Sequence, residues 1–172
     1  MSEFDPTVTA YHEAGHILLA EWLGGRVIFA SVIPSDESAI ATHDGPVRSH
    51  GETRALWPHA ESATQHENLA KVALAGPVAE MIYCDEQYEP RMLREWWTDW
   101  VAADEAIRAS QTRQLGDQDR MLRLSRLVHE LIEYFSRDEV WDRIAMVADH
   151  LEAHETLEQE QLDELRESQF FG

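Results

Sequence analysis

Two histidines stand four residues apart in the segment YHEAGHILLAEWLGG, which runs from residue 11 to residue 25. Residues at this spacing lie on one face of an α-helix, so His12 and His16 can direct both imidazoles at one point, as a tetrahedral zinc ion requires. Glu13 lies about 100° around the helix from His12, within reach of a water bound to such an ion. The pattern predicts two metal ligands and a separate general base.

Zinc held by three protein groups lowers the pKa of its water to about 7, and a nearby carboxylate takes the proton as the hydroxide attacks a peptide carbonyl. The same five-residue pattern also arises by chance in a chain with nine histidines. Gly15 favours the zinc interpretation, because glycine inside a helix costs about 1 kcal/mol relative to alanine and suits a place where another backbone approaches closely.

A catalytic zinc site needs a third protein ligand, and the residues leave four alternatives. The pattern with a third histidine six residues after the second fails, because Trp22 holds that position. The remaining candidates are Glu80, Asp99, Asp104 and His66. Zinc accepts both carboxylates and imidazoles, so ligand preference does not separate them.

Helical patterns occupy most of the chain. Asp5 and Pro6 form a helix start and Gly24-Gly25 a helix end, so both histidines are expected on one helix. A second helix is expected from Ser62, kinked or divided at Gly76-Pro77. Later helices are expected after Thr98 and over 118–135, 137–153 and 157–167, the last two opened by capping boxes at Ser136 with Glu139 and at Thr156 with Gln159.

Strand patterns are confined to the region between the first two helices. The β-branched run at 26–34 and the segment at 38–45 predict a small sheet beside the first helix. The stretch 45–58 has no periodicity and is interpreted as a loop. The fold class is therefore α+β, mostly helical. We expect the strand at 27–33 to offer an exposed edge to an extended polypeptide.

Charge and cysteine content limit the function classes. The chain has 172 residues, 33 of them acidic and 14 basic, and its net charge of −19 excludes nucleic acid and anionic membrane surfaces as expected partners. Cys84 is the single cysteine and is expected to be a buried apolar residue in a reducing compartment. The acidic start MSEFDP does not resemble a secretory signal. We expect a cytoplasmic protein without a membrane span.

Four segments in order resemble the zinc metalloprotease domain of the FtsH-type ATP-dependent proteases. They are HEAGH at 12–16, VIP at 32–34 with AIA at 39–41, LAGPVAEMIY at 74–83 and WTDWVAADEAIRA at 97–109. The resemblance covers roughly residues 7 to 110. It implies a zincin-like catalytic core over 1–115, and we expect residues 116–172 to form a helical extension packed on the same domain.

The resemblance also assigns roles to residues. It implies that His12, His16 and Asp99 are zinc ligands and that Glu13 is the general base. Glu80 would be a carboxylate that orients a histidine, the alternative being a solvent-facing helix residue. For Asp99 the alternative is a carboxylate favoured by the positive end of its helix. Residues on the strand near the site, Val32 and Ile33, are the expected substrate-binding residues, and Trp96, Trp97 and Trp100 are core or line a substrate groove.

The sequence departs from the family in three respects. Ser35-Asp36 stands where the family has arginine and glycine, and Pro77 where it has arginine. Neither a membrane anchor nor a Gly-rich phosphate loop is recognisable, so we expect a stand-alone domain that acts without ATP, with a homo-oligomer or a separate unfoldase as its remaining protein partners.

The prediction is a zinc-dependent metalloendopeptidase that cleaves unfolded or flexible polypeptides. The alternative from another class is a metallopeptidase-derived zinc-binding regulator or adaptor with little or no proteolytic activity. A third interpretation is a helical structural protein whose motif is accidental and which binds no metal stoichiometrically. Glu13 favours the enzyme, because a binding module has no use for a base.

Overall fold

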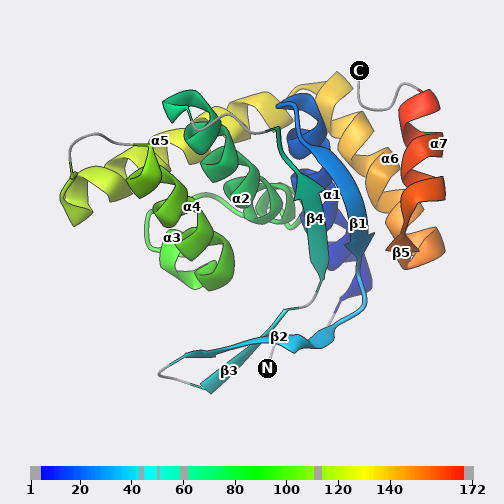
Figure 1. Cartoon of the computed structure of the whole chain (residues 1–172), viewed down its shortest axis with the longest axis horizontal. Helices are drawn as coiled ribbons and strands as arrows, with labels where there is room; N and C mark the ends of the chain where they lie inside the picture. Colours follow the sequence, from blue (N-terminus) through cyan, green and yellow to red (C-terminus); the bar gives the residue numbers. More distant parts are fainter. Residues whose placement is uncertain (1–4, 43–44, 50, 59–61, 111–113, 169–172) are drawn as a thin grey trace.

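The computed structural model describes residues 5–42, 45–49, 51–58, 62–110 and 114–168, with backbone only for 35–49. The fold is α+β and mostly helical, as predicted (Figure 1). Its helices are α1 (Pro6–Trp22), α2 (Ala63–Tyr83), α3 (Met92–Glu95), α4 (Trp97–Ala109), α5 (Asp117–Phe135), α6 (Asp138–His154) and α7 (Gln159–Glu167). Its strands are β1 (Arg26–Ser31), β2 (Ser35–Thr42), β3 (Gly45–Ser49), β4 (Glu52–Leu56) and β5 (Thr156–Leu157).

Helix α1 begins and ends at the expected signals. The Asp5 side chain accepts a hydrogen bond from the Thr7 N–H at 2.9 Å, and Pro6 occupies the first turn, where no intrahelical N–H is needed. After the helix, Gly24 takes a φ of 95°, a conformation that favours glycine. Both histidines of the motif therefore lie in the interior of one regular helix.

The sheet differs from the prediction in two ways. The stretch expected to be a loop contains β3 and β4, and β4 pairs antiparallel with β1, so the loop interpretation is wrong. Strand β1 is the centre of the order β4-β1-β5, whereas β2 pairs with β3 in a separate hairpin that projects away from the body of the molecule (Figure 1). The expectation that β1 forms an exposed edge is also wrong.

Side chains complete the edge of β1 that short β5 leaves uncovered. The Val27 N–H donates to Glu21 Oε1 at 2.8 Å, and the Val27 carbonyl accepts from Arg166 Nη2 at 2.5 Å. The same Arg166 nitrogen lies 2.6 Å from Glu21 Oε1, so α7 ties β1 to the end of α1. This backbone is satisfied without a further strand.

The helices of the second half agree with the predicted boundaries within about two residues, but their caps differ. Helix α2 runs without division through Pro77, and the Ser62 side chain accepts from the Gln65 N–H as expected. Arg137 is the N-cap residue of α6 and makes no side-chain cap bond, so the capping box at Ser136 is wrong. The box expected at Thr156 lies instead at Glu158 with Gln161.

One apolar core joins the amino-terminal and carboxy-terminal helices. Helix α2 packs against α1, α4 and α5, α6 packs against α1, and α1 covers one face of the β1–β4 sheet. Cys84, expected to be buried, is exposed just after α2, where the chain has left this core. None of the described helices has the length and apolarity needed to cross a bilayer. The boundary near residue 115 stays a prediction.

Candidate metal site

Glycines let α1 and α2 approach closely at the histidines. A Cβ atom on Gly15 would lie 2.4 Å from the Ala75 carbonyl oxygen, and one on Gly76 would lie 2.3 Å from His16 Nε2. Any side chain at either position therefore displaces a helix or the imidazole. The close backbone approach expected at Gly15 is confirmed, and Gly76 is its counterpart on the facing helix.

Helix α2 orients both imidazoles. The His12 Nδ1–H donates to Glu80 Oε2 at 2.7 Å, and the His16 Nδ1–H donates to the Val72 carbonyl oxygen at 2.7 Å. In the neutral imidazoles the proton is thus held on the outer nitrogen, which leaves each Nε2 with a lone pair for a metal ion. The two Nε2 atoms lie 3.1 Å apart and face the same point.

Asp99 in the first turn of α4 completes this group. Its Oδ2 lies 3.1 Å from His12 Nε2 and its Oδ1 3.4 Å from His16 Nε2. His12, His16 and Asp99, here called the His–Asp group, are the set of metal-type ligands that converges within 4.8 Å among the described residues. The three side chains are 12–23% exposed, so the group is partly accessible to solvent. Its members are able to hold a metal ion.

The other candidates for third ligand lie elsewhere or act differently. Glu80 contacts the outer nitrogen of His12, away from the point where the Nε2 atoms converge. Asp104 is bound by two guanidinium groups, with Oδ2 accepting from Arg108 Nε at 2.9 Å and Oδ1 from Arg120 Nε at 2.8 Å. His66 lies in the first turn of α2 and does not belong to the group.

Glu13 lies beside the group and is held by β4. It is buried, with 4% of its surface exposed, and its Oε2 accepts a hydrogen bond from Thr53 Oγ1 at 2.5 Å. Burial raises the pKa of Glu13, although His16, His12 and the Thr53 hydroxyl counter this in part. Sequence analysis missed Thr53 because its segment was interpreted as a loop.

The three members of the His–Asp group shift one another's pKa values. Burial alone would lower the pKa of His12, but its hydrogen bonds to Asp99 and Glu80 outweigh burial and raise that pKa well above its ordinary value. The pKa of His16 is also raised, against burial, by Asp99. Burial would raise the pKa of Asp99, yet the two histidines hold it well below its usual range. The group therefore attracts positive charge, as protons or as a metal ion.

The residues expected to contact substrate separate into buried and exposed members. Val32 is buried and its N–H donates to the Glu155 carbonyl at 2.9 Å, whereas Ile33 is 51% exposed. Trp97, two residues before Asp99, is 41% exposed and packs beside the partly buried Trp100. Ile33 and Trp97 thus remain available to a ligand, and Val32 does not.

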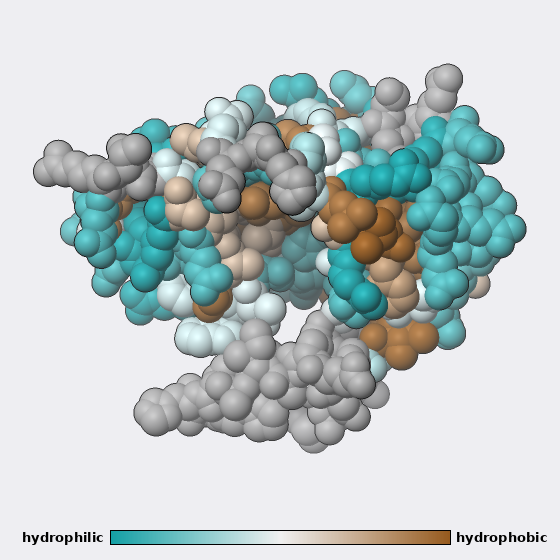
Figure 2. Space-filling model, viewed as in Figure 1, coloured by the Kyte–Doolittle hydropathy of each residue, from teal (hydrophilic) through white to brown (hydrophobic). Residues whose placement is uncertain are grey.

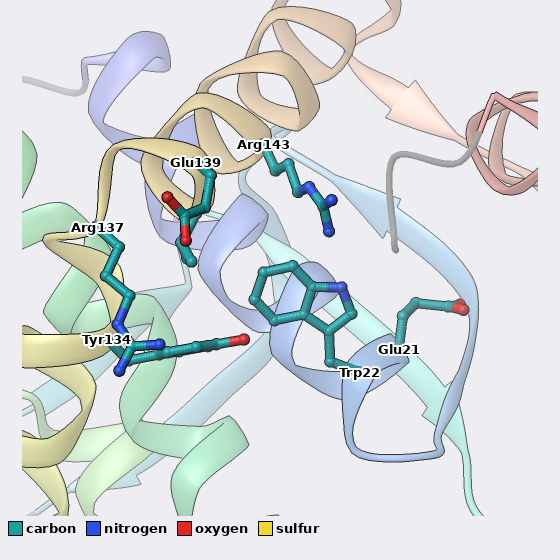
Figure 3. A pocket seen from close by; sticks show the side chains of 7 residues that line it. Glu21, Trp22, Tyr134, Arg137, Glu139 and Arg143 are labelled. Carbon is teal, nitrogen blue, oxygen red and sulfur yellow. The ribbon is translucent and has the colours of Figure 1, made fainter.

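An open hollow of about 480 Å³ lies apart from the His–Asp group, at the far end of α1. Figure 3 shows Arg137 beside the Tyr134 ring and Arg143 beside Trp22, with guanidinium-to-ring distances of 5.3 and 5.7 Å. Glu139 lies between the two arginines (Figure 3). Two glutamates, Glu21 and Glu139, line the hollow together with the two arginines, and none of the expected site residues lines it.

Comparison with known proteins leaves the site's geometry as the main guide to function. Neither a protein-family model nor a curated protein sequence matches the chain. The FtsH-type resemblance therefore rests on the four segments themselves. In the structure, residues from the first and the last of these segments, His12 and His16 from one and Asp99 from the other, converge on one point.

Proposed function

We propose that the protein is a zinc-dependent metalloendopeptidase with a zincin-like, FtsH-type catalytic domain. The observation that carries the proposal is the spacing of the His–Asp group. The edge of a tetrahedron around zinc, with ligands at about 2.0–2.2 Å, is roughly 3.3–3.6 Å long. The two Nε2 atoms lie 3.1 Å apart, and Asp99 approaches His12 Nε2 to 3.1 Å through Oδ2 and His16 Nε2 to 3.4 Å through Oδ1, separations close to that length.

The chemistry of the donors also fits zinc. Two neutral imidazoles and one carboxylate are a common ligand set for a catalytic zinc, and they leave a coordination position open. Both histidines donate their outer N–H to oxygen acceptors, Glu80 and the Val72 carbonyl, as zinc-binding histidines do. Zinc bound by such a set lowers the pKa of a bound water and polarises a substrate carbonyl.

In this proposal each residue beside the metal has one task. His12, His16 and Asp99 hold the ion, and Glu80 fixes the tautomer and rotation of His12. Glu13 takes the proton from the nucleophile and returns it to the leaving amine. Its buried position and raised pKa suit a group that must bind and release a proton near neutral pH.

The substrate is proposed to be an extended polypeptide that pairs with the outer edge of β4. Within the described part of the chain β4 pairs only with β1, so its second edge is open, and its Thr53 contacts the base. Hydrophobic surface gathers over the three-stranded sheet between hydrophilic helices (Figure 2). Main-chain pairing selects unfolded or flexible segments over folded ones.

The first test measures metal content and hydrolysis together. Protein purified without added metal is expected to carry about one zinc per chain by mass spectrometry and to cleave casein or a quenched peptide without ATP. Glu13→Gln should keep the zinc and the fold but reduce hydrolysis at least about a thousandfold, because proton transfer from the nucleophile is lost.

The outcomes separate the candidate functions. Zinc with no hydrolysis by the unaltered protein would identify the zinc-binding regulator. Absence of stoichiometric metal would leave a helical structural protein. Loss of zinc in Glu13→Gln would show that Glu13 is a ligand or a structural residue, contrary to its proposed role.

A further inference from the structure

We infer that Thr53 is a positioning residue, which fixes the carboxylate of Glu13 for proton transfer. The inference rests on the proposed function and concerns a residue outside the HEAGH motif. Thr53 Oγ1 donates to Glu13 Oε2 at 2.5 Å across 40 positions of sequence. Since Oε2 is engaged, the rotation of the carboxylate is set by the sheet as well as by its own helix.

The pairing of β4 with β1 determines the position of the Thr53 hydroxyl. Thr53 is opposite Ala30 of β1, and Ala30 is opposite Leu157 of β5 on its other side. Ala30 and Leu157 are fully buried. A one-residue slip of β4 would turn the Thr53 side chain to the opposite face, so the register of the sheet is coupled to the geometry of the base.

Gly51, the residue just before β4, packs against the same carboxylate. A Cβ atom there would lie 2.5 Å from Glu13 Oε1 and 2.9 Å from its carboxyl carbon. The carboxylate is thus packed against a backbone that carries no side chain, while Thr53 holds it by a hydrogen bond. Together they restrict the side chain to one orientation, which is how a supporting group raises the rate of a proton transfer.

The test compares two substitutions of Thr53 with a control in the same sheet. Thr53→Val removes the hydroxyl and keeps the shape, whereas Thr53→Ser keeps the hydroxyl. Thr156→Val removes a different hydroxyl bond, that to Ser31 Oγ at 3.0 Å on the opposite side of β1. Kinetics on a quenched peptide and zinc content are measured for all three.

If Thr53 positions the carboxylate of Glu13, its substitution should change kcat and not KM or zinc content. Thr53→Val should lower kcat by about tenfold to a hundredfold with KM and zinc content unchanged, because the carboxylate is no longer fixed. Thr53→Ser should restore kcat to within about threefold, and Thr156→Val should leave kcat unchanged. An unchanged kcat in Thr53→Val, or equal losses in Thr53→Val and Thr53→Ser, would overturn the inference.

A second measurement does not depend on hydrolysis. Urea unfolding of Glu13→Ala, Thr53→Val and the double variant should give a coupling of about threefold to tenfold in the unfolding equilibrium constant, because alanine leaves no acceptor for the Thr53 hydroxyl. Additive effects would show that the two side chains do not interact and would overturn the inference. If the coupling is present but the unaltered protein cleaves no peptide, the proposed function fails while the contact stands, and Thr53 then serves the structure rather than a base.

Discussion

Asp99 and Asp104 belong to the same helix, about one and a half turns apart, and they form two different kinds of polar centre. Asp104 accepts hydrogen bonds from two arginines, whose guanidinium groups carry permanent positive charge. Asp99 faces two imidazoles, which become neutral whenever a metal ion takes their Nε2 atoms. Both aspartate side chains are mostly shielded, with 23% and 11% exposed for Asp99 and Asp104. The partners, rather than burial, distinguish a candidate metal ligand from a structural carboxylate.

Removing each aspartate in turn tests this comparison with the largest expected effect. Asp99→Ala should lose zinc and hydrolysis, because it removes one of three ligands, and should leave the fold intact by circular dichroism. Asp104→Ala should keep zinc but lower the free energy of unfolding by about 3 kcal/mol, because the mostly buried Arg120 loses a partner. Zinc retained by the first variant and lost by the second would reverse the two roles.

Adding one methyl group at the helix crossing should weaken the metal site without touching a ligand. Gly76→Ala places a Cβ atom 2.3 Å from the present position of His16 Nε2, so the affinity for zinc should fall about a hundredfold, measured by competition with a chelating dye. Gly116→Ala is the matched control, since its Cβ would meet nothing closer than 4.0 Å. Equal zinc affinity in both variants would mean that α2 shifts freely and that the close approach does not fix His16.

Glu80 supports one histidine from outside the metal position, so its effect should be smaller. Glu80→Gln keeps a hydrogen-bond acceptor for His12 but removes the charge, and zinc affinity should fall about tenfold. Glu86→Gln, an exposed neighbour beyond the end of α2, should leave it unchanged. If Glu80→Ala depletes zinc more than Asp99→Ala does, Glu80 is the third ligand.

The pH dependence of stability should have opposite signs with and without zinc. In the metal-free protein the pKa values of His12 and His16 are raised above 6.5, so their stabilising contribution is complete below pH 6.5 and is lost as pH rises through the raised values. With zinc bound the imidazoles must be neutral, so stability should increase over the same range. Thermal melts from pH 6 to 9 with zinc or with chelator give the two slopes, and equal slopes would contradict the metal site.

Local signals in the sequence predicted the helices well. The start of α1 depends on Asp5 and Pro6, and the start of α2 on Ser62, each acting within four residues of its own position. The motif's helix and the close approach at Gly15 followed from the same local reasoning. The N-cap residues were predicted less well. Arg137, next to Ser136, is the N-cap residue of α6, and Thr156 belongs to β5 instead of capping α7.

Features that depend on distant partners were not predictable. The segment ETRAL becomes a strand because β1 lies beside it, and its own residues have no strong strand pattern. The acceptor for His16 is a backbone carbonyl, which any residue at position 72 would supply. The residues by themselves left four candidates for the third ligand, of which the resemblance implied Asp99, and the packing of α4 on α2 brings Asp99 rather than Asp104 to the two histidines.

The hydrogen bonds of Arg166 to Glu21 and to the Val27 carbonyl also affect when the fold is completed during synthesis. Glu21 and Val27 leave the ribosome long before α7, which carries Arg166, is made. Until then the edge of β1 beside β5 is unprotected, and α1 lacks the cover that α6 provides. The nascent chain is therefore expected to hold its histidine helix loosely until α7 has been made, so that the arrangement of His12, His16 and Asp99 becomes stable only after that point of synthesis.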